Sequence, residues 1–238
     1  MKTLIIVPTL NEKENIKLFI KKIKIEKLKF DILFIDDNSI DGSQKLIKQL
    51  RKKNNHIHYI FRPKKMGIGS AHKDGLKWCY KKKYNFVITI DVDGTHEPKF
   101  IKLLINNLKN NDIVITNRFI KKNSLKDWPV NRIFLTYLRY ILVKVFLSVP
   151  YDSSGAFRYI NCKNIPLKDL LLAKDNGYSF FWESIFLLNR KKFKISEVGI
   201  LMPYRQVGNS HMKLKDIYSA FFYLLWVFVK KIFGKYNF

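Results

Sequence analysis

The chain has 238 residues, of which 45 are basic and 19 acidic, so its formal net charge at pH 7 is +26. Hydrophobic residues make up 47% of the chain and aromatic residues 15%, which excludes a disordered protein despite the charge. Ten glycines and seven prolines exclude a collagen-like or low-complexity chain, and two cysteines exclude a disulfide framework or a structural zinc site. This length and cysteine usage indicate an intracellular protein with a substantial core.

The basic charge has two possible partners, nucleic acid and an anionic membrane surface. Lysines are scattered through helical stretches such as residues 21–24 instead of being gathered in one motif. This distribution argues against nucleic acid as the main partner. An anionic membrane fits at least as well, because each basic residue close to the headgroups contributes about 1 kcal/mol of attraction.

The first half of the chain alternates between two hydrophobic periods. Short β-branched and aromatic runs predict five strands, at Thr3–Pro8, Asp31–Asp36, Ile57–Phe61, Phe86–Asp91 and Ile113–Thr116. Apolar residues at helical spacing predict helices between them, around residues 16–23, 46–50, 76–79 and 101–108. This alternation predicts an α/β fold, with a mainly parallel sheet that carries helices on both faces. Ligands bind such sheets beyond the carboxyl ends of the strands.

The second half is less regular. Its pattern predicts an amphipathic helix from about Asn131 to Leu147, a loop from Pro150 to Arg158, a helix that includes Phe181–Leu188, and an extended Lys194–Pro203 segment. No linker rich in glycine, proline or serine divides the chain, so we expect one domain over residues 1–213, followed by a C-terminal helical segment over residues 214–238.

The C-terminal segment contains the longest uncharged apolar run, the 13 residues Ile217–Val229. A membrane-spanning helix needs about 20 such residues. Lysines flank the run, and tyrosine and tryptophan lie within it, which is typical of a helix in a membrane interface. A C-terminal helix packed on the core is an equal alternative. The apolar run near the N-terminus is too short for a secretory signal.

Acidic side chains cluster at two predicted strand ends. Asp36, Asp37 and Asp41 follow the second strand, and Asp91 and Asp93 follow the fourth, so we expect these groups at adjacent strand ends. Side chains alternate along an extended backbone, which places Asp91 and Asp93 on one side, where they repel unless a cation is near. Mg²⁺ or Mn²⁺ prefers oxygen ligands and takes the remaining ones from substrate phosphates. The clusters therefore predict a metal–diphosphate site, with turns and helix caps as the alternative reading.

An ordered series of motifs, from about residue 3 to residue 213, resembles family 2 glycosyltransferases. The nucleotide-sugar half of that family is matched by Val7–Glu12, Asp36–Ser43, Gly67–Gly69 and Asp91–Asp93. The later motifs are similar to the dolichol-phosphate mannose synthase branch, also called polyprenol-phosphate glycosyltransferases. They are Asn117–Arg118, Trp128 with Arg132, Asp152–Arg158, and Arg205 with Gly208 and Ser210.

The resemblance implies a GT-A fold and an inverting transfer of a sugar from a nucleotide-diphosphate sugar, of the GDP-mannose or UDP-glucose type, to a polyprenyl monophosphate. It implies that Pro8, Glu12 and Asp37 hold the nucleoside. Asp91 and Asp93 would hold Mg²⁺ or Mn²⁺ and the donor diphosphate, with Thr95 as a further metal ligand. Arg118, Arg132 and Arg205 would surround the phosphates, with Asp91, Asp93, Arg118 and Arg205 as the catalytic set.

Three further positions complete the expected substrate-binding set, and two of them have an alternative. Arg158 contacts substrate or forms an ion pair. Glu183 contacts the sugar or the acceptor, or is a buried carboxylate paired with an arginine. Ser210 ends the last motif, and His211 follows it where the family commonly has lysine, which makes that charge dependent on pH.

The chemistry of the expected reaction agrees with these residue types. An acceptor phosphate is already ionised at neutral pH and needs positioning instead of a strong general base. A metal ion stabilises the charge that develops on the departing diphosphate. Arginine suits phosphate because its planar fork donates two hydrogen bonds, and only eight arginines occur among the 45 basic residues.

Two rival functions remain open from the sequence. A family 2 transferase that acts on a polysaccharide or another hydroxyl acceptor would need a carboxylate general base, for which Glu183 and Asp152 are candidates. The second rival is a nucleotide- or nucleic-acid-binding module without catalysis, which would need no general base. The preferred hypothesis places the enzyme in the cytoplasm, peripherally on the cytoplasmic face of the membrane.

Overall fold

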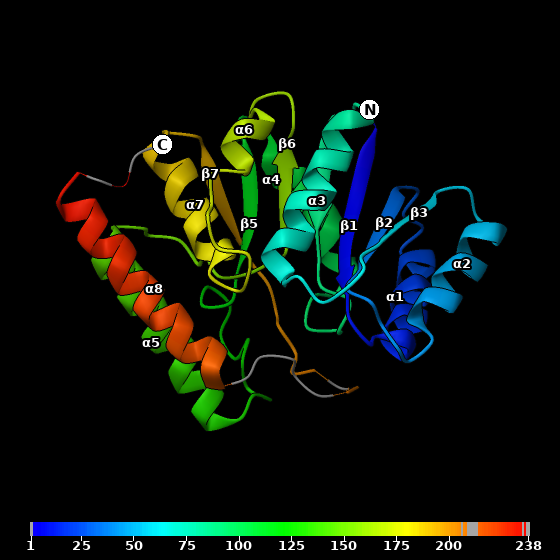
Figure 1. Ribbon diagram of the computed structural model, residues 1–238, viewed down its shortest axis with the longest axis horizontal. Coiled ribbons are helices and arrows are strands. Elements are labelled where there is room, and N and C mark those ends of the chain that lie inside the picture. The colour runs from blue at the N-terminus through cyan, green and yellow to red at the C-terminus, as the bar shows by residue number, and fades with distance from the viewer. Residues whose placement is uncertain (1, 206, 209–213, 235, 237–238) are drawn as a thin grey trace.

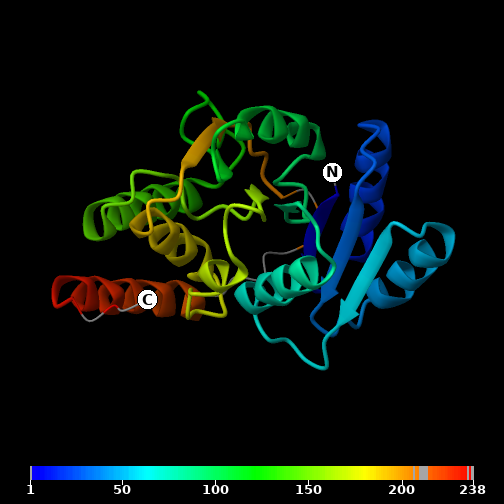
Figure 2. The same ribbon diagram turned by 90° about the horizontal axis from the view of Figure 1, so that it is seen from above.

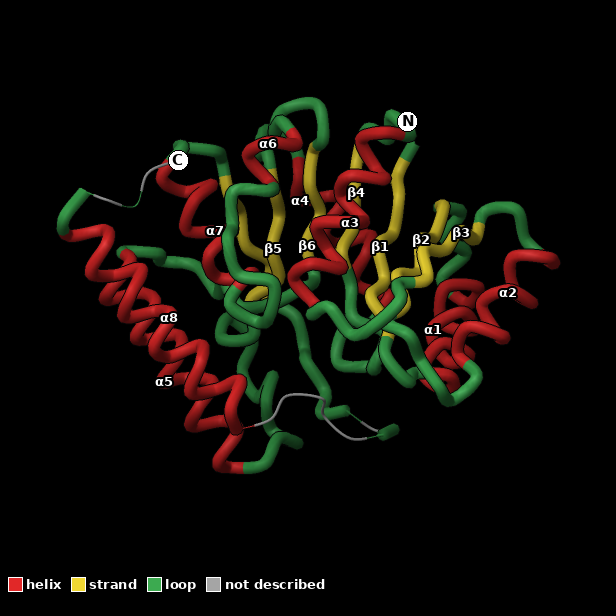
Figure 3. The backbone as a smooth tube through the Cα atoms, in the orientation of Figure 1, coloured by secondary structure: helices red, strands yellow, loops and turns green. Residues whose placement is uncertain are grey.

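The computed structural model describes residues 2–205, 207–208, 214–234 and 236. Seven strands form one sheet (Figures 1 and 3), and they are β1 (Thr3–Thr9), β2 (Asp31–Asp36), β3 (Ile57–Phe61), β4 (Phe86–Thr89), β5 (Ile113–Asn117), β6 (Arg158–Asn161) and β7 (Ile195–Gly199). The helices are α1 (Lys13–Ile25), α2 (Ser43–Lys53), α3 (Ile68–Lys81), the 3-10 turn η1 (Pro98–Phe100), α4 (Ile101–Leu108), α5 (Val130–Leu147), α6 (Leu167–Leu170), α7 (Phe180–Arg190) and α8 (Leu214–Ile232).

The sheet has the strand order β3-β2-β1-β4-β6-β5-β7, and helices cover both of its faces (Figure 2). Residues 4–7 of β1 are fully buried because each face of this central strand is covered. Leu4 and Ile6 join the core beneath α3 and α7, while Ile5 and Val7 join the core beneath α1, α2 and α4. The α/β architecture and the mainly parallel sheet agree with the sequence-based prediction.

Three details differ from the prediction. β6 was not predicted: the expected loop ended at Arg158, where this strand begins, and β6 pairs antiparallel with both β4 and β5. β4 ends at Thr89, so Asp91 and Asp93 lie in the following loop and not on an extended strand end. The expected adjacency of the second and fourth strands is wrong, because β1 pairs with both and lies between them.

The carboxyl ends of all strands except β6 lie at one edge of the sheet, the lower edge in Figure 1. The loops at this edge are residues 10–12, 37–42, 62–67, 90–97 and 118–129, together with the described part of the segment that follows β7. Because these loops converge, the residues that carry chemistry are brought together here.

Helices α5 and α8 lie side by side and extend away from the sheet (Figures 1 and 3). The rings of Phe146 and Phe228 stack between them at 4.6 Å, and the ammonium of Lys231 donates to the carbonyl of Phe146 at 2.9 Å. Only three residues of α5 and two of α8 are buried. Among the described residues, no helix is both long and apolar enough to cross a membrane.

Candidate active site

Two carboxylates face the open edge from the loop after β4. The side chains of Asp91 and Asp93 are 28% and 23% exposed. Burial of the carboxyl, followed by the charges of Asp93 and Glu12, raises the pKa of Asp91 to about 8, although Arg118 and Arg205 act in the opposite direction. Thr95 orients Asp93, since its backbone N–H and its hydroxyl donate to Oδ1 at 3.1 and 2.7 Å.

This pair fits a hard divalent cation. Its donor atoms are carboxylate oxygens, and a cation beside them would oppose the effect of burial and of the charges of Asp93 and Glu12, which raise the pKa of Asp91. Among the described residues, no group of three or more His, Cys, Asp or Glu side chains could hold a metal ion. A cation at Asp91 and Asp93 would therefore take further ligands from outside these residue types, as Mg²⁺ and Mn²⁺ do from substrate phosphates.

Arg205 joins this pair to the loop after β1. Its Nη2 donates to both carboxylate oxygens of Glu12 at 2.8 Å, and its Nη1 lies 3.7 Å from Oδ2 of Asp93. Glu12 is buried, and burial raises the pKa of this carboxyl, partly offset by Asn15 and Arg205. One guanidinium thus serves two carboxylates that approach from neighbouring strands.

Arg118, directly after β5, forms a buried pair with Asp152. Its backbone N–H and its Nε donate to Oδ2 of Asp152 at 3.0 and 2.7 Å. Burial opposes the charge on Asp152, but Arg118 holds the pKa of this carboxyl below its ordinary value.

The first acidic cluster mainly builds the loop after β2. Asp36 is fully buried and accepts hydrogen bonds from Thr9, Ser39 and Gln44. Asp41 accepts the backbone N–H groups of Lys13 and Ser43 at 2.9 Å each. These contacts stabilise the loop between β2 and α2.

Asp37 has a different environment from its neighbour. It forms a buried ion pair with Arg62, and its Oδ2 accepts the backbone N–H groups of Met66 and Gly67 at 3.1 and 3.2 Å. Arg62 was missed by sequence reasoning. Its position directly after the third strand, in a chain with few arginines, was the available signal.

Arg158, an expected substrate-binding residue, makes its contacts within the protein. It is buried and donates to the carbonyls of Gly155, Ser153 and Phe181 and to the hydroxyl of Ser184. Burial lowers the pKa of Arg158 to about 9.

Glu183 is also fully buried, but its partners are not arginines. It accepts the backbone N–H groups of Lys174 and Asp175 and the hydroxyls of Tyr223 and Tyr236. The prediction of an arginine-paired carboxylate is wrong in its partner, although the burial is as expected.

The remaining expected residues are placed as follows. Pro8 lies in β1 opposite Ile35 of β2, near the carboxyl end of the strand. Arg132, in the first turn of α5, lies with its guanidinium 5.9 Å from the ring of Tyr204. Ser210 and His211 lie outside the described residues.

A second missed arginine lies on α5. The Nε of Arg139 is buried without a hydrogen-bond partner among the described residues, and burial lowers the pKa of this side chain to about 10. Arg118 lowers it further, while Asp152 opposes the shift. Nothing in the hydrophobic period of α5 distinguishes Arg139 from a surface residue.

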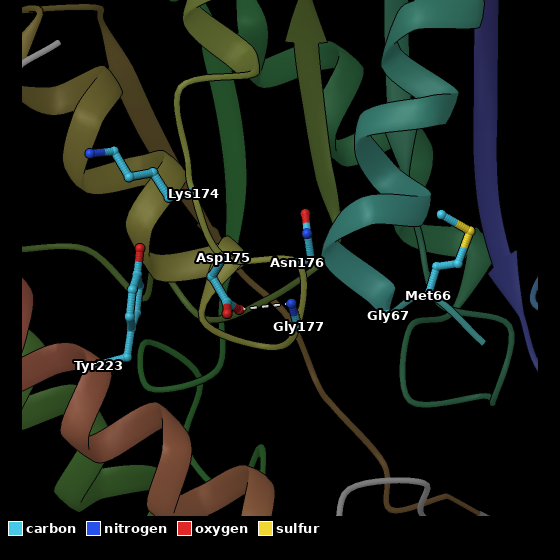
Figure 4. A pocket seen from close by; sticks show the side chains of 7 residues that line it. All are labelled: Met66, Gly67, Lys174, Asp175, Asn176, Gly177 and Tyr223. Atoms are coloured by element: carbon cyan, nitrogen blue, oxygen red, sulfur yellow. Dashed lines mark hydrogen bonds between the residues drawn. The ribbon is translucent and has the colours of Figure 1, made fainter. Parts of the chain in front are cut away.

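A cavity of about 510 Å³ opens beside these loops (Figure 4). It is lined by Met66 and Gly67, by residues 174–177, and by Tyr223 of α8. The pKa of the adjacent Tyr178 is raised to about 12 by burial and then by Asp91, which places this loop beside the carboxylate pair. The cavity therefore borders the site on the side that faces α8.

Comparison with known proteins decides the family. The profile of glycosyl transferase family 2 matches residues 4–194, which is most of the chain. The chain belongs to glycosyl transferase family 2. The non-catalytic binding module is therefore set aside, and the protein is a glycosyltransferase with the GT-A architecture expected from its motifs.

Two curated relatives of this family 2 chain align over most of its length. Polyprenol monophosphomannose synthase of Mycolicibacterium smegmatis is 27% identical over 224 residues, which cover 93% of this chain and 84% of the relative. Undecaprenyl-phosphate mannosyltransferase of Micrococcus luteus is 26% identical over 213 residues, 89% of this chain and 88% of the relative.

Solved structures share the fold of this family 2 chain. Mannosyl-3-phosphoglycerate synthase from Rubrobacter xylanophilus superposes with a TM-score of 0.66 and 16% identity, covering 99% of this chain and 74% of that one. Glucosyl-3-phosphoglycerate synthase from Mycobacterium tuberculosis, solved with Mn²⁺, UDP and glucosyl-3-phosphoglycerate, superposes with a TM-score of 0.60 and 17% identity, covering 97% and 79%.

Proposed function

We propose that this protein transfers a sugar, with inversion, from a nucleotide-diphosphate sugar to a polyprenyl monophosphate, with the help of Mg²⁺ or Mn²⁺. Mannose from GDP-mannose is the first candidate, because the names of both curated relatives specify mannosyl transfer to such lipids. Glucose from UDP-glucose is the second, because a structural neighbour was solved with that donor and Mn²⁺.

One observation favours a phosphate acceptor over a hydroxyl acceptor. Both carboxylates that could have served as general base are buried and fully engaged. Asp152 is paired with Arg118, which depresses its pKa, and Glu183 accepts four hydrogen bonds. A base of depressed pKa that is turned toward an arginine is poorly suited to take a proton from a sugar hydroxyl. A phosphate acceptor needs no such proton transfer.

The residues divide between the donor and the acceptor in this proposal. Pro8, Glu12 and Asp37 line the nucleoside side of the site. Asp91 and Asp93 hold the metal ion, which stabilises the charge on the departing diphosphate when it is bound. Thr95 orients Asp93 and is a further candidate ligand.

Cationic side chains surround the phosphates in the same proposal. Arg118, Arg132 and Arg205 provide them from the loop after β5, from α5 and from the segment after β7. Arg158 stabilises the neighbouring loop, because it donates hydrogen bonds to the carbonyls of Gly155 and Ser153. Ser210 would complete the acceptor side.

We further propose that α5 and α8 place the enzyme on the cytoplasmic face of the membrane. Both helices, and Phe233 directly after α8, expose large apolar side chains, the most exposed being Val130, Phe134, Val145, Leu214, Tyr218, Phe222, Ile232 and Phe233. Large exposed apolar patches on proteins mark sites of interaction with partners or membranes. Residues 1–213 would form the catalytic domain and residues 214–238 the lipid-facing segment, which brings a polyprenyl phosphate within reach of the arginines.

A transfer assay tests the function. Purified full-length protein is supplied with radiolabelled GDP-mannose or UDP-glucose, with Mn²⁺, with Mg²⁺ or with a chelator, and with undecaprenyl phosphate or an oligosaccharide as acceptor. We expect metal-dependent label in the lipid product with one donor. Label that enters only the oligosaccharide would contradict the proposal and favour a hydroxyl acceptor.

A further inference from the structure

The carboxylate of Glu183 joins three parts of the chain in the core. Its Oε1 accepts the backbone N–H of Lys174 at 2.8 Å, the hydroxyl of Tyr223 at 3.0 Å and the hydroxyl of Tyr236. Its Oε2 accepts the backbone N–H of Asp175 at 3.0 Å. Tyr223 lies on α8 and Tyr236 follows it, so one fully buried carboxylate holds both the C-terminal helix and the 174–177 loop.

The 174–177 loop is in turn fixed against the first turn of α3. The carbonyl of Asn176 accepts the backbone N–H of Ser70 at 3.1 Å, and Lys73 donates to the carbonyl of Asp175 and to the side chain of Asn176 at 3.0 Å each. A Cβ at Gly69 would lie 2.8 Å from the carbonyl of Gly177, so only glycine permits this approach. These contacts hold the loop against the start of α3.

The start of α3 is bonded to the nucleoside side of the site. Met66 and Gly67 donate their backbone N–H groups to Asp37. Arg62, paired with Asp37, donates to the carbonyl of Gly67 at 2.9 Å and to the hydroxyl of Ser70. The hydrogen bonds thus run from Tyr223 and Tyr236 through Glu183 and the 174–177 loop to Asp37.

The cavity in Figure 4 shows why the loop is the connection. Tyr223 lies on one side of this space and Met66 with Gly67 on the other, and residues 174–177 lie between them. Of the segments that line the cavity, the loop is therefore the one that bridges α8 and the start of α3.

We propose that Glu183 is a positioning residue that couples the docking of α8 to the nucleotide-binding side of the active site. This inference rests on the proposed function for the identity of the ligand, a nucleoside diphosphate with its metal ion. When α8 is docked, the two tyrosine hydroxyls and the two loop N–H groups share one carboxylate. When the hydroxyls are lost, the buried carboxylate of Glu183 retains only the two backbone N–H donors of the loop. It must then reorient toward water or other polar groups. That reorientation releases the loop and loosens Met66 and Gly67 against Asp37.

The test removes the hydroxyls and leaves the rings. The double variant Tyr223→Phe/Tyr236→Phe and the single variant Glu183→Gln are compared with wild type as full-length protein in detergent. Lys231→Ala is the control, because Lys231 ties α8 to Phe146 and Ser148 and does not contact Glu183. The measurements are the Kd of GDP and of UDP with Mn²⁺, the KM values of donor and acceptor, and amide hydrogen exchange.

We expect the double variant to weaken nucleoside-diphosphate binding and raise the donor KM about three- to tenfold, the size of effect of losing one or two buried hydrogen bonds, with the acceptor KM within twofold of wild type. The amides of Met66, Gly67 and Ser70 should exchange faster in it. Lys231→Ala should lower thermal stability and leave the donor KM and these amides at wild-type values.

Two results would overturn the inference. The first is a double variant whose donor KM, nucleotide Kd and amide exchange at Met66, Gly67 and Ser70 all match wild type, which makes Glu183 a purely structural anchor. The second is a Lys231→Ala variant with the same loss of nucleotide affinity, which makes the effect a general one of loosening α8. A wild-type protein that binds neither nucleotide would instead refute the proposed function, and hydrogen exchange at the same amides would still decide the coupling.

Discussion

Nη2 of Arg205 donates to both carboxylate oxygens of Glu12 at 2.8 Å, although the two residues are 193 positions apart in the chain. The contact closes the segment that follows β7 over the loop that follows β1. It also brings Nη1 of Arg205 to 3.7 Å from Asp93. Arg205 therefore lies between Glu12, which we propose lines the nucleoside side, and Asp93 of the carboxylate pair, where a donor diphosphate would be held in this proposal.

Replacement of Arg205 by lysine should reduce transfer strongly. Lysine keeps the charge but cannot serve Glu12 and Asp93 with separate donors of one planar group. We expect kcat/KM for the nucleotide sugar to fall at least about tenfold, since charge-stabilising donors at reacting groups have effects of this size or larger. Arg190→Lys is the control, because Arg190 is exposed at the end of α7 and stacks on Phe186. Equal kcat/KM for both variants would contradict the assignment of Arg205.

Asp93→Asn should abolish metal-dependent transfer and leave the fold intact. The change removes a charged oxygen ligand and keeps the size of the side chain, so the cation loses affinity. Transfer should fall about a thousandfold or more, by analogy with the loss of a dominant electrostatic group at a reacting centre. The assay is transfer at increasing Mn²⁺.

The matched control for Asp93→Asn is Asp112→Asn. Asp112 accepts hydrogen bonds from Asn164 and from the backbone of Lys194 just before β5 begins, away from the edge that carries the active site. The Asp112→Asn variant should keep wild-type transfer activity and wild-type dependence on Mn²⁺. An active Asp93→Asn protein would mean that the carboxylate pair does not hold the metal.

The central strands were predictable because burial on both faces leaves near-continuous apolar runs, as at residues 4–7. β6 was not, because it is four residues long and begins with Arg158 and ends with Asn161. Strand order was not predictable either. A crossover that inserts β1 between β2 and β4 leaves no trace in the local pattern of any of the three strands.

In the candidate site, the sequence motifs named residues that the structure brings together, but they did not predict the contacts of those residues. Asp91, Asp93, Glu12, Arg118 and Arg205 were all named from motifs, and the structure brings them to one edge. The side-chain partners of Asp37 and Glu183 were missed because they come from positions 25 to 53 residues away with no periodic relation to them. Long-range pairing of this kind depends on tertiary packing.

His72 predicts a measurable dependence of stability on pH. It is 1% exposed, its ring stacks on Phe180, and its Nε2 has no partner among the described residues. Burial, then the charge of Arg158, lowers its pKa to about 3. Between pH 6.5 and 3 the unfolded chain therefore binds a proton that the folded protein does not, so the free energy of unfolding falls as the pH falls.

The slope from this one group is at most about 1.4 kcal/mol per pH unit. The variant His72→Leu should lose it. Chemical denaturation of both proteins from pH 6.5 down to pH 4.5 measures the two slopes. A packing change from leucine shifts the whole curve and leaves its slope alone. Parallel curves for wild type and variant would show that His72 is not a buried neutral group.

The proposed membrane contact of α5 and α8 can be tested by replacing exposed aromatic side chains on them with charged ones. Phe134 and Phe222 are each 65% exposed, one on each helix. Burial of one such side chain in lipid is worth about 1.5–3 kcal/mol, so Phe134→Glu/Phe222→Glu should weaken binding to vesicles at least about tenfold. Sedimentation with vesicles of phosphatidylcholine and phosphatidylglycerol measures this.

The control carries the same change in charge at the other end of the sheet. Ile25 and Tyr59 are 64% and 40% exposed at the end of α1 and on β3. The variant Ile25→Glu/Tyr59→Glu should lose only the part of the binding that net charge provides, and added salt should remove that part from wild type as well. If the two double variants sediment equally at high salt, α5 and α8 do not enter the interface, and the lipid must reach the active site from another face.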